Sequence, residues 1–215
     1  MTTAVLFGIT GYAGGHIARE LLSRGVDVVG VARDATSVQS AGATTTVSGS
    51  IHDASFVAQV TKAADVVVVA VPSGPVDGKK LIDALPTLLS TLTENGTRLG
   101  IVGGAGSLHV APGGPRLVDT PDFPVEYKGE AQSHSDVLDA LRESDTTVDW
   151  FYVSPAAGFG AHHEGTATGR YRIGNDVLLT DSEGDSEISG ADYATAFADE
   201  ILTPTHHQAR FTVAY

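Results

Sequence analysis

Residues 4–15 decide the fold of this chain, and their sequence is AVLFGITGYAGG. The first four residues are apolar, which is typical of a short buried strand. Glycines follow at positions 8, 11 and 14, and residues 17–22 then carry apolar side chains at the spacing of one helix face. A strand, a glycine turn and a helix in this order form the setting in which such glycines bind a dinucleotide.

Each glycine of this turn has a separate predicted role. Gly8 takes the tight turn after the strand, Gly11 lets the backbone approach a pyrophosphate, and Gly14 lets the helix pack close to the sheet. The free N–H groups and the positive dipole end of the helix then face the phosphates. A glycine-rich turn without a ligand is the alternative, but the flanking strand and helix favour nucleotide binding.

The composition sets broad limits on the function. A length of 215 residues suits a single α/β domain over residues 1–215, with small substrate-side elements at about residues 155–205. The absence of cysteine excludes disulfides and thiolate metal sites, and no histidine has further ligands at metal-site spacing. The net charge of −13 argues against nucleic-acid binding. With neither a signal-peptide pattern nor a bilayer-length apolar run, we expect a cytoplasmic protein that does not engage membranes.

The remaining apolar runs predict parallel strands that alternate with helices. Further strands are expected at residues 26–32, 43–47, 65–71, 98–102, 148–153 and 210–215. Helices are expected after the N-cap Asp53, from residue 79 to the Asn95-Gly96 stop with a kink or restart at Pro86, over residues 126–144, and after a Ser189–Asp192 capping box. Residues 170–173 and 177–179 flank a turn and predict a β-hairpin.

This order of elements predicts an α/β fold. We expect a Rossmann-like doubly wound parallel sheet with helices on both faces. The hairpin and the last helix should form a small C-terminal cap over the crevice at the carboxyl ends of the strands.

That crevice supplies the predicted cofactor ligands, because open α/β sheets bind ligands along the carboxyl edge of their strands. The predicted cofactor-binding residues are Gly8, Thr10, Gly11, Tyr12, Ala13, Gly14, Arg33, Ser50, Ile51, Ala70, Val71, Pro72, Gly103 and Pro155. No metal ligand is predicted.

Arg33 determines the predicted choice of cofactor. It ends the second strand, where an arginine can pair with the 2′-phosphate of NADP, whereas an acidic residue would accept from the 2′-hydroxyl of NAD. Asp34 follows directly and keeps NAD open as the alternative. Arg33 favours NADP, unless it is only a solvated surface charge.

Several motifs occur together and in order along the chain. They are the glycine triplet, VGGAGSL at residues 102–108, the run from Asp149-Trp150 to Ser154-Pro155, the run from Ile188-Ser189 to Ala194, and RFTV at residues 210–213. With them the chain resembles the atypical short-chain dehydrogenase/reductases of the NAD(P)H-binding, NmrA-like kind, many of which carry the name NADH-flavin reductase. The resemblance covers nearly the whole chain.

The resemblance implies a Rossmann fold, bound NAD(P)H and a planar substrate such as a flavin (FMN or FAD) or a quinone. In these folds an aspartate after the third strand commonly binds the adenine amino group. Ser50 stands at that place here, which weakens or moves the contact.

Catalytic residues are less well defined by the sequence. Typical short-chain dehydrogenases use a serine and a YxxxK pair, but Ala131 lies four residues after Tyr127. Tyr127 and the adjacent Lys128 diverge by about a hundred degrees if both are helical. The catalytic candidates are Ser107, Tyr127 and Lys128, with His162 as a further polar group, and each has a structural role as its alternative.

Three functions are therefore compatible with the sequence. The favoured one is an NAD(P)H-dependent reductase acting on a small planar acceptor, as a monomer or homodimer. A non-catalytic, NADP-binding redox sensor of the NmrA type is the alternative, supported by the missing YxxxK. A nucleotide-sugar epimerase or dehydratase is less favoured, because such enzymes usually need YxxxK and a larger C-terminal domain.

Overall fold

A single mixed sheet organises the protein. The computed structural model describes residues 2–34 and 43–215, so residue 1 and residues 35–42 of the predicted domain lie outside the described part. Within that part, eight strands form the order β3-β2-β1-β4-β5-β6-β8-β7. Their bounds are β1 Thr3–Phe7, β2 Asp27–Ala32, β3 Thr45–Ser48, β4 Val66–Val69, β5 Arg98–Val102, β6 Trp150–Ser154, β7 Arg172–Gly174 and β8 Ala209–Ala214.

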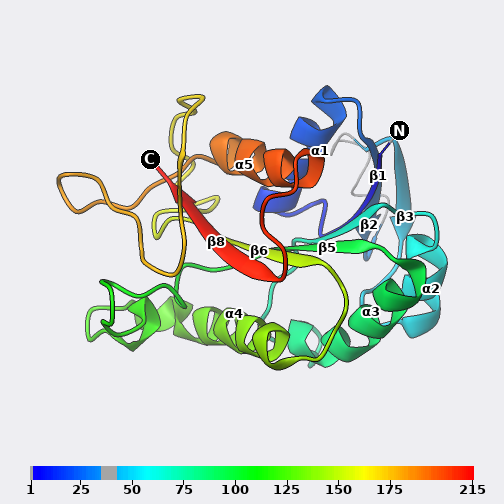
Figure 1. Ribbon diagram of the computed structural model, residues 1–215, viewed down its shortest axis with the longest axis horizontal. Helices are drawn as coiled ribbons and strands as arrows, with labels where there is room; N and C mark the ends of the chain where they lie inside the picture. The colour runs from blue at the N-terminus through cyan, green and yellow to red at the C-terminus, as the bar shows by residue number, and fades with distance from the viewer. Residues whose placement is uncertain (1, 35–42) are drawn as a thin grey trace.

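Helices cover both faces of the sheet (Figure 1). One face carries α1 (Tyr12–Ser23) and α5 (Gly190–Leu202), and the other carries α2 (Ala54–Thr61), α3 (Leu81–Asn95) and α4 (Val125–Glu143). A short 3₁₀ helix, η2 (Leu117–Asp119), precedes α4. Along the sheet, every pair from β3 through β2, β1, β4, β5 and β6 to β8 is parallel, which confirms the predicted doubly wound α/β fold.

The centre of the sheet follows directly from its sequence. All four residues of β4 are valines with at most 3% exposure, as expected for a strand covered on both faces. β4 pairs with β1 from Ala4↔Val66 to Phe7↔Val69, so the ends of these two strands lie side by side. The glycine turn after β1 therefore starts at the middle of the carboxyl edge.

The predicted C-terminal hairpin forms with a different partner. β7 pairs antiparallel with β8 and not with residues 177–179, so that part of the prediction is wrong. The N–H of Leu178 instead donates to the carbonyl of His109 at 2.9 Å. β8 is a long, buried strand next to β6, and pairing with it satisfies the backbone of β7 better than a short local turn would.

Helix ends agree with the predicted caps in part. Asp53 caps α2 by accepting from the Phe56 N–H at 3.1 Å. Ser189 caps α5 by accepting from the Asp192 N–H at 3.1 Å, but the reciprocal half of the box is absent. Asp192 accepts from the N–H groups of Thr168 and Gly169, at 2.7 and 3.0 Å, and so ties that loop to α5.

The third helix differs from its prediction at its start. α3 begins at Leu81 and not at residue 79, because residues 76–79 form a tight turn of their own. The helix then continues through Pro86 and ends at Gly96, whose φ of 67° is the expected left-handed C-cap.

Two glycines bring β1, α1 and β4 into contact. Gly8 has φ +87°, and a Cβ there would lie 2.3 Å from the Ala70 carbonyl oxygen. A Cβ on Gly14 would lie 2.2 Å from the Gly8 carbonyl oxygen. The close helix-to-strand packing predicted for Gly14 is thereby confirmed.

An ion-pair network closes the opposite, amino edge of the sheet. Arg98 contacts Glu200 at 2.7 Å and Asp149 at 2.9 Å. The Glu200 carboxylate is 3% exposed and also binds His206 at 2.7 Å. Burial alone would raise the pKa of Glu200, but hydrogen bonds from His206 and Arg98 outweigh it and lower this pKa to about 2.

No helix in residues 2–34 and 43–215 has both the length and the apolar character needed to cross a membrane.

Gly14→Ala should destabilise the protein by about 1–3 kcal/mol or more, because the new methyl group must displace backbone at the β1–α1 turn. Gly15→Ala is the matched control: its Cβ would lie 3.5 Å from the Ile9 carbonyl oxygen, an ordinary contact. It should be neutral or gain up to about 1 kcal/mol from helix propensity. Urea unfolding of both variants measures the difference, and equal stabilities would contradict the close-packing role.

Glu200→Gln should cost roughly 3 kcal/mol at pH 7, because it leaves Arg98 short of a buried partner. The folded-state pKa lies below the unfolded one, so this stabilisation is complete above about pH 4.5 and is lost as the pH falls toward 2. The gap between wild type and variant should therefore shrink at pH 3 in urea unfolding, whereas the exposed Glu183→Gln should match wild type. A gap that is the same at both pH values would show that the carboxylate charge is unimportant.

Candidate functional site

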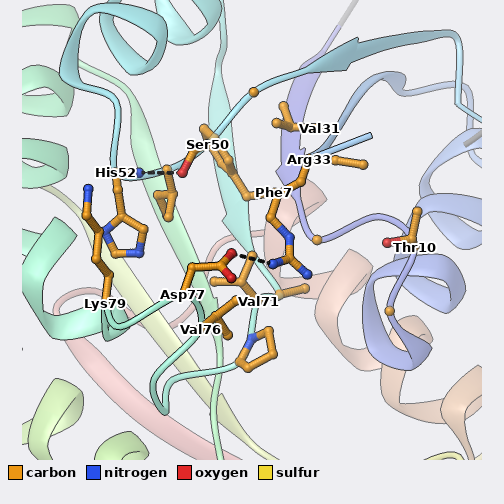
Figure 2. Close-up of a pocket in the computed structure, with 17 residues that line it drawn as sticks. Phe7, Thr10, Val31, Arg33, Ser50, His52, Val71, Val76, Asp77 and Lys79 are labelled. Carbon is orange, nitrogen blue, oxygen red and sulfur yellow. Dashed lines mark hydrogen bonds and ion pairs between the residues drawn. The ribbon is translucent and has the colours of Figure 1, made fainter. Parts of the chain in front are cut away.

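A cavity of about 430 Å³ lies at the carboxyl ends of β1, β2 and β4 (Figure 2). Phe7, Val31, Ile51 and Val71 give it apolar walls. Thr10 and Gly11 bring the first turn of α1 to one side of it. The cavity thus joins an apolar surface to the amino end of a helix.

The amino end of α1 is free of side-chain caps. The N-cap residue is Gly11, so no N-cap side chain accepts from the first N–H groups of the helix. No acidic residue lies in the first turn. The first N–H groups of any α-helix lack partners within the helix, and its amino end carries partial positive charge. The absence of a side chain at Gly11 leaves this end open to an anion, so the donors present fit the diphosphate of a dinucleotide.

Charged and polar side chains form the rim of the cavity. Arg33, at the end of β2, makes a 2.9 Å ion pair with Asp77, in the loop after β4. Figure 2 shows the guanidinium and carboxylate groups meeting between these two segments. On the other side, the backbone N–H of His52 donates to the Ser50 hydroxyl at 3.2 Å, and Lys79 lies beside these two residues.

Most of the predicted cofactor residues line this one cavity: Gly8, Thr10, Gly11, Arg33, Ser50, Ile51, Ala70, Val71 and Pro72. Ala13 and Gly14 lie in the first turn of α1 behind it. Gly103 and Pro155 are buried after β5 and β6, farther along the same edge of the sheet.

The Tyr12 side chain makes its contacts within the protein and does not line the cavity. Its hydroxyl accepts from the Gly190 N–H at 3.0 Å and donates to the Glu164 carbonyl at 3.2 Å. Its ring packs edge-on against Phe159 with a centroid distance of 5.4 Å. Tyr12 therefore joins α1 to α5 and to the loop after β6.

The cavity is also lined by residues that were not predicted: Phe7, Val31, Ala32, Gly49, His52, Val76, Asp77 and Lys79. Phe7 and Ala32 are the last residues of β1 and β2, and Val31 directly precedes Ala32, so the carboxyl-edge rule alone could have identified these three. Asp77 and Gly78 have φ values of +52° and +77°, and the N–H and carbonyl groups of Val76 and Lys79 pair across them. An Asp-Gly pair is the usual signal of such a turn, and the sequence carried it.

The catalytic candidates lie in separate surroundings. Tyr127, in the first turn of α4, is 47% exposed and stacks on His162 at 5.5 Å and 17°. Lys128 is exposed beside it on a different face of the helix. Ser107 is 3% exposed, and its hydroxyl accepts from the buried Arg210 at 3.3 Å. The structure brings Tyr127 and His162 together and holds Ser107 in another network.

A second polar network, which no sequence motif indicated, ties α4 to the carboxyl edge. Glu130 accepts from the N–H groups of Ser73 and Gly74, at 2.7 and 2.8 Å, and lies 3.4 Å from His134. Burial would raise the pKa of Glu130, but the hydrogen bonds from His134 and Ser73 lower it to about 2. Tyr152 accepts from the Gly104 N–H, and its burial raises the pKa of its hydroxyl well above the usual range.

Within residues 2–34 and 43–215, no three histidine or acidic side chains come together as a metal site.

Known proteins agree with this geometry. Residues 8–204 match the family described as NAD(P)H-binding. The uncharacterized protein YwnB of Bacillus subtilis (strain 168) is 37% identical over 97% of this chain and 96% of its own length. Two solved structures match the whole of this chain. One is a Bacteroides thetaiotaomicron protein provisionally named an epimerase, which is 33% identical over 97% of its own chain, with a TM-score of 0.88. The other is a Streptococcus pneumoniae TIGR4 protein provisionally named an NADH-flavin reductase, which is 29% identical over 99% of its own chain, with a TM-score of 0.82. The chain therefore belongs to the NAD(P)H-binding family of atypical short-chain dehydrogenase/reductases.

Proposed function

We propose that this protein is an NAD(P)H-dependent reductase for a small planar acceptor such as a flavin or a quinone. The observation that carries the proposal is the apolar cavity that opens onto the uncapped amino end of α1. When bound, NAD(P)H would supply the hydride for the acceptor, and a proton completes the reduction. The name of the Streptococcus pneumoniae relative supports this class of reaction.

The chain's own residues would bind and orient the cofactor. The apolar walls at Val31, Ile51 and Val71 suit an adenosine group, and the amino end of α1 suits the diphosphate. Arg33 would pair with a 2′-phosphate, which is the reason for favouring NADP. The nicotinamide half would continue along the carboxyl edge toward Gly103 and Pro155.

At neutral pH the acceptor also takes up a proton, from a side chain at the site or from water. Glu130 is ionised there, since its pKa is about 2, and Tyr152 holds its proton tightly. Glu130 would instead fix the loop at Ser73 and Gly74 against α4. Tyr127 and Lys128 are the accessible candidates for proton transfer. The buried Ser107 would instead help to position the loop after β5.

A non-catalytic NADP sensor is the second candidate function. The position four residues after Tyr127 holds Ala131, which is 9% exposed, so the tyrosine–lysine pair of typical short-chain dehydrogenases is absent here. The same absence disfavours an epimerase or dehydratase, despite the name of the Bacteroides thetaiotaomicron relative.

The purified protein should oxidise NADPH, followed at 340 nm, when FMN, FAD or a quinone is added, and should do so above the rate without protein. Gly11→Val is the matched control. Its backbone has an ordinary φ of −75°. Its Cβ would lie 3.3 Å from the Gly8 carbonyl oxygen, a tight contact that a shift of a few tenths of an ångström relieves, so the fold should survive. The valine methyl groups would cover the helix end and abolish cofactor binding.

Tight NADPH binding without turnover on any acceptor would favour the sensor over the reductase. If neither NADPH nor NADH binds wild type at millimolar concentration, both functions are refuted. Normal binding by a folded Gly11→Val variant would place the cofactor elsewhere.

A further inference from the structure

The ion pair between Arg33 and Asp77 lies on the rim of the cavity, beside the proposed site of the adenosine ribose. The Arg33 and Asp77 side chains are 70% and 83% exposed, and their charged atoms are 2.9 Å apart. Such an exposed pair contributes little to stability. Its position therefore has more consequence for a ligand than for the fold.

The turn that carries Asp77 fixes where this carboxylate lies. Val76 and Lys79 exchange backbone hydrogen bonds of 2.8 and 3.1 Å across the turn, and Figure 2 shows the Asp77 side chain pointing from this turn toward Arg33. Asp77 has φ +52°, a conformation that aspartate and asparagine tolerate better than most residues. The carboxylate is thus held opposite the arginine by a defined turn.

A 2′-phosphate and the Asp77 carboxylate would compete for the same guanidinium. The phosphate would have to displace or share the carboxylate, and the two negative groups would repel each other at this distance. A 2′-hydroxyl carries no charge and would meet no such penalty. Arg33 attracts the phosphate of NADPH, and Asp77 offsets part of that attraction.

We propose that Asp77 sets the cofactor preference of this protein by competing with a 2′-phosphate for Arg33. The inference rests on the proposed binding of NAD(P)H, and it names a residue that limits the preference for NADPH over NADH. The wild-type chain should consequently discriminate weakly between the two cofactors.

Asp77→Asn tests the proposal, because it removes the charge and keeps a residue suited to the turn. Dissociation constants for NADPH and NADH are measured by nicotinamide fluorescence for wild type, Asp77→Asn, Arg33→Ala and the double variant. Asp77→Asn should tighten NADPH binding about fivefold and leave NADH within about twofold. Arg33→Ala should weaken NADPH far more than NADH, and Asp77→Asn should change the ratio less in that background.

Glu94→Gln is the control for net charge, since it removes the same charge near the far end of α3. It should leave the ratio of the two dissociation constants unchanged, and melting temperatures show whether each variant is folded. An unchanged ratio in Asp77→Asn, or the same ratio change with and without Arg33, would overturn the role of Asp77 alone. A wild-type protein that binds neither cofactor would refute the proposed function itself.

Discussion

The contact between three backbone segments at the carboxyl edge of the sheet is the constraint on which the rest of the structure depends. The end of β1, the first turn of α1 and the end of β4 approach so closely that a Cβ on Gly8 or Gly14 would overlap a carbonyl oxygen. The buried valines of β4 hold one side of this contact, and the packing of α1 on the sheet holds the other. The same contact presents the uncapped end of α1 to the cavity, so the fold and the candidate site share one origin.

The electrostatics of the site are local. The chain carries a net charge of −13, which opposes anion binding at long range. An uncapped helix end and Arg33 provide the positive potential, and Asp77 reduces it at the place where a 2′-phosphate would lie. Farther along the edge, Glu130 occupies the N–H groups of Ser73 and Gly74, so those donors belong to the fold and not to a ligand.

The sequence predicted the parts of the structure that depend on local patterns. The positions of the parallel strands, the tight turn at Gly8, the close packing at Gly14 and most of the predicted cofactor residues in the cavity follow from strand periodicity and the carboxyl-edge rule. Contacts between distant segments could not be predicted in this way. The partner of β7 is β8, the partner of Ser107 is Arg210, 103 positions away, and the Tyr12 ring is directed by its contact with Gly190. Asp77 is intermediate: its Asp-Gly turn was readable, but the direction of that turn toward Arg33 was not.

Amide chemical shifts measured during titration with NADP⁺ test the central claim most directly, because they report which N–H groups meet the diphosphate. We expect the largest saturable shifts on Gly11, Tyr12 and Ala13, with smaller ones at the ends of β2 and β4. Shifts confined to other segments, with the first turn of α1 unchanged at saturation, would contradict that claim.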